Sequence, residues 1–181
     1  MSVSKRVGYY AFNVFDYMNC PSVANYMFFD PGAEVVPGIF IGSLATAQNG
    51  PWLSANKIDT IINVSAKNYK SDLRQFDILL YDIDITPELM GVFMKSFDHA
   101  AMITVGEIKN NRRVLIHCAQ GVNRSAMCIA WYLMYNNYSY DQIIHLLTRA
   151  NNTRDMPVLT NMSFRRLLAT LTTIASIKNK K

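Results

Sequence analysis

Short apolar runs alternate with longer amphipathic segments along most of the chain. Three runs rich in β-branched residues, at 39–41, 58–64 and 114–116, predict buried strands, and residues 78–85 predict a fourth. Strands that alternate with helices are typical of an α/β domain. We therefore expect a central, mainly parallel sheet that is flanked by helices.

Apolar residues at helical spacing follow Thr86-Pro87-Glu88, three residues whose types suit an N-cap and a first helical turn. The buried face of this helix is expected to comprise Leu89, Val92, Phe93, Phe97, Ala100 and Ala101. Further helices are expected over residues 125–135, after the capping box of Ser139 and Gln142, and over residues 161–177.

The composition of the chain indicates three parts. Half of the 181 residues are apolar, which suffices for one domain with a full core. Residues 1–30 are rich in Tyr, Phe, Asn and Met and end in a turn signal, Asp30-Pro31-Gly32. We expect an N-terminal segment over residues 1–30, a folded domain over 31–177 and a basic tail over 178–181. The N-terminal segment carries apolar residues that need cover from the domain or from a second copy of the chain, namely Tyr9, Tyr10, Phe12, Val14 and Phe15.

Other features of the sequence exclude some classes of protein. No run of about 18 apolar residues predicts a membrane span, and the first residues do not resemble a secretory signal. Cys20, Cys118 and Cys128 form no C-x-x-C pair, which favours free thiols in a reducing compartment over disulfides or a zinc site. The net charge of +5 attracts anionic partners without choosing among them.

The segment that carries candidate chemistry runs from Val114 to Ser125, where an apolar strand leads into a loop and the loop leads into a helix. Five residues separate Cys118 from Arg124, enough backbone to surround one tetrahedral oxyanion with amide N–H groups. The following helix directs its positive N-terminus at the same point. The residues expected to bind a phosphate group are therefore Ala119, Gln120, Gly121, Val122, Asn123 and Arg124.

Several residues in or near this segment have an expected role. Cys118 lies among amides, a helix N-terminus and an arginine, which favours the thiolate and makes it the candidate nucleophile. The planar fork of Arg124 matches two phosphate oxygens. Ser125 is placed to donate a hydrogen bond to the sulfur, and His117, at a buried strand end, is expected to fix the loop rather than carry protons. Cys128, inside an apolar helix, is expected to be a core residue.

At these residues the sequence resembles the dual-specificity protein tyrosine phosphatase family, and the poxviral members in particular. Residues 117–125 match the family signature His-Cys-x-x-Gly-x-x-Arg-Ser, and the likeness extends over about residues 33–175. It implies the family's fold and hydrolysis of phosphotyrosine and phosphoserine/threonine proteins through a phosphocysteine, with no cofactor or metal. The poxviral likeness implies a viral protein of the host cytoplasm or the virion that acts on host signalling proteins, and a homodimer through residues 1–30.

The family also uses an aspartate upstream of the loop as general acid, in front of a helix. The resemblance favours Asp84 because it lies just before the helix N-cap, and Asp82 and Glu88 stay open as alternatives. Lys67-Asn68-Tyr69 follows a strand and is interpreted as a solvated turn.

Three other functions remain open on the same loop. An RNA 5′-triphosphatase suits the basic charge, although nucleic acid is not the expected partner. A phosphoinositide phosphatase is disfavoured because no lysine lies between Cys118 and Arg124 to bind a multiply charged head group. A module that binds phosphoproteins without turnover is disfavoured by the intact Cys118, Arg124 and Ser125.

Overall fold

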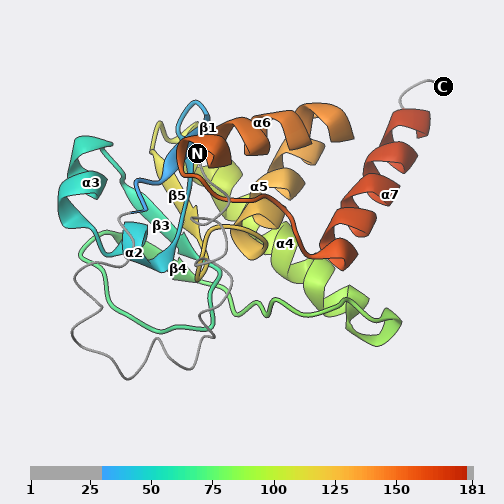
Figure 1. Cartoon of the computed structure of the whole chain (residues 1–181), viewed down its shortest axis with the longest axis horizontal. Helices are drawn as coiled ribbons and strands as arrows, with labels where there is room; N and C mark the ends of the chain where they lie inside the picture. The colour runs from blue at the N-terminus through green and yellow to red at the C-terminus, as the bar shows by residue number, and fades with distance from the viewer. Residues whose placement is uncertain (1–29, 179–181) are drawn as a thin grey trace, which may run out of the picture.

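The computed structural model describes residues 30–178, which fold into a central sheet with helices on both faces (Figure 1). The elements follow one another as β1 (Ala33–Val36), β2 (Ile39–Gly42), α2 (Leu44–Ala47), α3 (Gly50–Ala55), β3 (Thr60–Asn63), β4 (Arg74–Asp77), α4 (Pro87–Lys109), β5 (Val114–His117), α5 (Arg124–Tyr135), α6 (Tyr140–Thr153) and α7 (Met162–Lys178).

The five strands form one sheet in the order β1-β2-β5-β3-β4. Strands β2, β5, β3 and β4 are parallel, and β1 pairs antiparallel with β2 at one edge. Figure 1 shows α2 and α3 on one side of this sheet and α4 to α7 on the other. The predicted α/β fold with a mainly parallel sheet is confirmed.

The alternation of side chains along the strands divides the core into two layers. Ile41, Ile62 and Ile116 face the larger layer, which α4 to α7 cover, whereas Phe40, Ile61 and Leu115 face the smaller layer beneath α2 and α3. Both faces of β2, β3 and β5 are thus buried, as expected for parallel strands inside a sheet. Helix α5 is buried on nearly every side and packs against both α4 and the sheet.

Two expectations about the elements were wrong. Residues 78–85 do not form a strand. The strand that pairs with β3 is instead β4, just before them, whose residues are mostly polar. Ile78 and Leu80 still point into the core, so the apolar alternation reports burial without strand pairing. Val92 on α4 is 61% exposed because the buried stripe of this helix runs through Phe93 and Phe97 instead.

Several other expectations about the helices hold. The capping box at the start of α6 is present: Ser139 Oγ accepts from the Gln142 amide, and Gln142 Oε1 accepts from the Ser139 amide. Thr86 precedes α4 as its N-cap but makes no capping hydrogen bond through its side chain. None of the helices between residues 30 and 178 is long and apolar enough to cross a membrane.

Some expectations fall outside the described residues. They concern Cys20, the apolar cluster and the dimerisation arm within residues 1–29, and residues 179–181 of the basic tail. The division of the chain at residues 30 and 177 therefore stays a prediction.

Candidate active site

The candidate site lies where the parallel strands end. Gly42, His117 and Asn63 are the last residues of β2, β5 and β3, and they lie side by side in register. Ligand sites of open α/β sheets typically lie outside the carboxyl ends of the strands. The loop of residues 118–123 begins at this edge and leads into the N-terminus of α5, so the predicted strand, loop and helix follow one another as expected.

The Cys118 thiol sits inside this loop and is only 2% exposed. Its Sγ accepts hydrogen bonds from the Gly121 amide at 3.2 Å and from the Ser125 hydroxyl at 3.4 Å. Burial by itself raises the pKa of Cys118. The charge of Arg124, the side-chain and backbone hydrogen bonds from Ser125, and the Gln120 amide together bring that pKa below its ordinary value. The surroundings therefore favour the thiolate, the reactive form of cysteine.

Arg124 is the first residue of α5 and is held beside the thiol. Its Nη1 donates to the Leu80 carbonyl at 3.3 Å, which orients the guanidinium. Its Nε is buried and has no hydrogen-bond partner among the residues that the structure describes. Buried donors are rarely left unpaired, so this N–H indicates a place for an acceptor oxygen of a bound anion.

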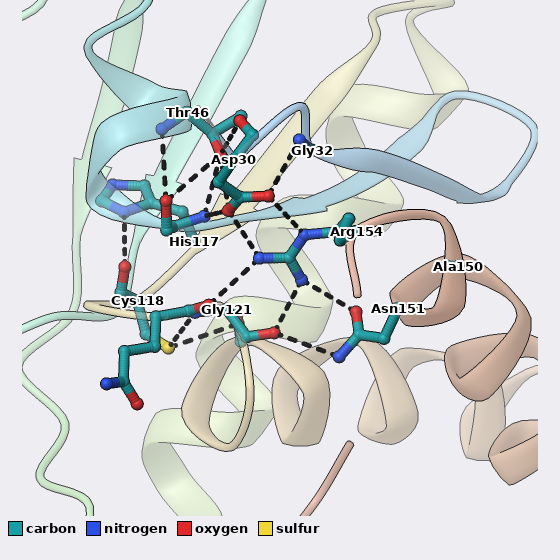
Figure 2. Close-up of polar contacts among 12 residues, drawn as sticks. Asp30, Gly32, Thr46, His117, Cys118, Gly121, Ala150, Asn151 and Arg154 are labelled. Carbon is teal, nitrogen blue, oxygen red and sulfur yellow. Dashed lines mark hydrogen bonds and ion pairs between the residues drawn. The ribbon is translucent and has the colours of Figure 1, made fainter. Parts of the chain in front are cut away.

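His117 links the loop to a residue that the sequence analysis misinterpreted. Its Nδ1 lies 3.2 Å from the Cys118 carbonyl oxygen (Figure 2) and its Nε2 lies 2.7 Å from the Tyr69 hydroxyl. Since a carbonyl only accepts, Nδ1 carries the proton and Nε2 accepts from Tyr69. Tyr69 is thus half-buried and hydrogen-bonded to the last residue of β5 rather than part of a fully solvated turn, although Lys67 and Asn68 beside it are exposed.

The protonation state of His117 follows from its burial. Burial lowers the pKa of His117 to about 4, so the imidazole is neutral at pH 7. A neutral ring that donates to the Cys118 carbonyl and accepts from Tyr69 holds the start of the loop in one orientation. This geometry is consistent with the predicted supporting role of His117.

The three candidate acids lie in different surroundings. Asp82 accepts from the Asn123 side chain and from the Asn161 side chain, both at 2.9 Å, so both of its oxygens are occupied. Asp84 accepts from the Ser163 hydroxyl at 2.6 Å through Oδ1. Both aspartates line one shallow surface pocket together with Asn123 and Asn161.

Glu88 differs from the two aspartates. It lies on the first turn of α4, is fully exposed, and hydrogen bonding with Thr86 lowers its pKa. A lowered pKa disfavours proton donation near neutral pH. The structure therefore brings Asp82 and Asp84 to the loop's surroundings, whereas Glu88 does not line that pocket.

Among residues 30–178, no group of three or more His, Cys, Asp or Glu side chains has a metal-binding arrangement. Cys128 is fully buried in α5 as expected, and burial raises the pKa of its thiol. His99 and His145 are exposed helix residues.

A buried cysteine in a loop between a central parallel strand and a helix, with an arginine at the helix start, defines the class of protein tyrosine phosphatase-like folds. Comparison with known proteins narrows this class. The family model described as dual specificity phosphatase, catalytic domain, matches residues 39–173. The chain belongs to the dual specificity phosphatase family.

Individual relatives agree with this assignment. Dual specificity protein phosphatase 18 of Rattus norvegicus is 33% identical over 108 residues, which cover 58% of this chain and 50% of the relative. Dual specificity protein phosphatase H1 of Variola virus is 28% identical over 135 residues, which cover 74% of this chain and 77% of the relative. The matches with dual specificity protein phosphatase 18 span only about half the length of those relatives.

Solved structures share the fold. The crystal structure of human DUSP28 superposes with a TM-score of 0.66 at 18% identity, over 81% of this chain and 95% of that one. The Orf virus tyrosine phosphatase OH1 superposes with a TM-score of 0.61 at 18% identity, over 78% of this chain and 86% of that one.

Proposed function

We propose that the chain hydrolyses phosphate monoesters on phosphotyrosine and phosphoserine/threonine proteins through a phosphocysteine intermediate. The observation that carries the proposal is the geometry around Cys118: a thiol whose pKa is lowered lies beside the buried, unpaired Nε of Arg124. A nucleophile and an anion-binding donor at one point are what attack on a phosphate dianion needs.

The reaction has two balanced steps. In the first step, the Cys118 thiolate attacks phosphorus, the bond between phosphorus and the ester oxygen breaks, and the leaving oxygen takes a proton from an acid. In the second step, the deprotonated form of that acid, a carboxylate, removes a proton from water. The water attacks the phosphocysteine and releases inorganic phosphate and the thiolate. The Ser125 hydroxyl, which already donates to Sγ, stabilises the sulfur as a leaving group.

Asp84 is the proposed acid. Asp82 has both oxygens engaged by the side-chain amides of Asn123 and Asn161. Asp84 has a hydrogen-bond partner on Oδ1 alone within the described part of the chain, so its other oxygen is available to carry the proton.

The proposal is tested on the full chain with a panel of four substrates: a phosphotyrosine peptide, a phosphoserine peptide, triphosphate-ended RNA and a phosphoinositide. We expect turnover of the two peptides, turnover that Cys118→Ser abolishes while phosphate still binds, and loss of both binding and turnover in Arg124→Ala. Binding of phosphopeptide by the wild type without turnover, or turnover by Cys118→Ser, would refute the mechanism.

The proposal has two further parts. The first is a homodimer through residues 1–30. The second is viral origin, with host phosphoproteins as substrates in the host cytoplasm or the virion. Support comes from the apolar cluster of the N-terminal segment and from the likeness to Variola virus H1. Sedimentation of the full chain and of a chain that begins at Asp30 tests the dimer. If both the full chain and the shortened chain sediment as monomers, the proposed dimer is refuted.

A further inference from the structure

Arg154, the C-cap of α6, lies buried behind the loop of residues 118–123, and its side chain is 0% exposed (Figure 2). A guanidinium has five N–H donors, and the structure gives Arg154 five hydrogen bonds. Nε and Nη2 bind the two oxygens of Asp30 at 2.7 and 2.6 Å. Nη2 also donates to the Gln120 carbonyl at 3.1 Å, and Nη1 donates to the Gly121 carbonyl at 2.9 Å and to Asn151 Oδ1 at 2.8 Å.

Asp30 is as fully engaged as its partner. Besides Arg154, its carboxylate accepts from the Gly32 amide at 3.1 Å, the Ser43 amide at 2.8 Å and the Thr46 hydroxyl at 2.8 Å. Burial alone raises the pKa of Asp30, but the Arg154 guanidinium and these donors bring it below its usual range. The buried pair therefore joins the chain before β1, the turn before α2 and the end of α6 at the back of the loop.

The contacts of Arg154 with loop carbonyls determine where the loop amides point. In a trans peptide, the C=O and the N–H point in opposite directions. The peptide between Gln120 and Gly121 donates its N–H to Cys118 Sγ at 3.2 Å while its carbonyl accepts from Arg154. Because Arg154 also binds the next carbonyl, that of Gly121, the Val122 amide is directed toward the opposite side.

Gly121 shows how tightly the pair fits the loop. Its φ of +71° lies in the left-handed region, and a Cβ there would overlap Arg154 Nη2 and the Gly42 carbonyl. Asn151 adds a second contact, because its Nδ2 lies 3.4 Å from the Gly121 carbonyl oxygen. The loop conformation is thus fixed from behind by side chains that do not face the thiol.

We propose that Asp30 and Arg154 are positioning residues that hold the loop amides of Gly121 and Val122 toward the thiol and the phosphate. The inference deepens the proposed function, on which its catalytic meaning rests. It also connects the N-terminal segment to the site, since Asp30 is the residue at which residues 1–30 end.

The test measures the rate of iodoacetamide alkylation of Cys118 against pH by peptide mass spectrometry, with and without inorganic phosphate. Among the described residues, the charged or titratable groups around this thiol are Arg124 and Cys128 from α5 and His117 from β5. Asp82 reaches the loop through Asn123. The two variants described next keep all of these groups. This readout needs no turnover, so it distinguishes failure of the inference from failure of the proposed function.

Asp30→Asn separates positioning from simple charge effects. Loss of a nearby negative charge alone would lower the pKa of Cys118, whereas release of the loop amides raises it. We expect a rise of about one unit, a tenfold loss of thiolate, together with about tenfold weaker protection by phosphate. Arg154→Lys keeps the charge but loses the fork, and we expect a rise of similar size.

Glu107→Gln is the matched control. Glu107 is a buried carboxylate that accepts from Arg112 and Thr60 at the opposite end of β3, so its variant loses stability without any shift in the thiol. An unchanged or lower pKa of Cys118 in Asp30→Asn, or a wild-type profile in Arg154→Lys, would overturn the inference. If Asp30→Asn does not fold, Arg154→Lys decides the question alone.

Discussion

Replacing Ser125 with alanine removes the hydrogen bond that its hydroxyl donates to the Cys118 sulfur. Ser125 is fully buried, so no water replaces its hydroxyl directly. A hydrogen bond to a charged group contributes about 1.5–3 kcal/mol, and the 3.4 Å separation of Oγ and Sγ places this one at the low end. Since one pKa unit corresponds to about 1.4 kcal/mol, the pKa of Cys118 should rise by about one unit in Ser125→Ala.

Two measurements check this expectation. The pH at which iodoacetamide alkylation of Cys118 reaches half its maximal rate should increase by about one unit. Hydrolysis of the phosphocysteine should slow by about tenfold, because the departing sulfur is the group that the hydroxyl stabilises. With an activated aryl phosphate, the variant should therefore show a burst of product that equals the enzyme concentration, followed by slow turnover.

Thr104→Ala provides the control for loss of a buried hydroxyl. Thr104 is fully buried in α4 and its Oγ1 donates to the Ala100 carbonyl, away from the loop. This variant should be destabilised without any change in the alkylation profile. An alkylation profile of Ser125→Ala that coincides with that of the wild type would show that the hydroxyl does not stabilise the thiolate.

Three other predictions concern the surroundings of the loop. Asp84→Asn should slow hydrolysis of a phosphotyrosine peptide by about 10²–10⁴-fold and of an activated aryl phosphate far less, whereas Asp82→Asn and Glu88→Gln should show neither effect. A wild-type peptide rate in Asp84→Asn would exclude Asp84 as the acid. Tyr69→Phe leaves a buried ring nitrogen of His117 unpaired and should lower the free energy of unfolding in urea by about 1–3 kcal/mol, and an unchanged value would refute this contact. Because the folded-state pKa of His117 is depressed to about 4, the unfolded chain binds the extra proton, so stability should fall as the pH drops from about 6.5 to 4; His117→Gln should flatten this slope in urea titrations at several pH values.

The strand, loop and helix of the site could be predicted because all their signals lie close together in the sequence. The apolar run of β5, the spacing of Cys118 and Arg124, and Gly121 at the tight point of the loop act within a dozen residues. The same local reasoning failed for β4. Its residues Arg74–Asp77 alternate only weakly in polarity because the strand lies at the edge of the sheet, where it pairs with β3 alone.

By itself, the sequence determined the fold class, the family and the residues that follow one another in the loop. Only the tertiary structure decided which side chains support that loop. Tyr69 lies 48 residues from His117 along the chain, and Asp30 lies 124 residues from Arg154. Helical and strand periodicities constrain neighbours a few residues apart. The partner of a buried charge, in contrast, depends on how the elements pack. The sequence therefore indicated only a turn at Asp30 and did not single out Arg154, and the fold places both residues behind the loop of residues 118–123.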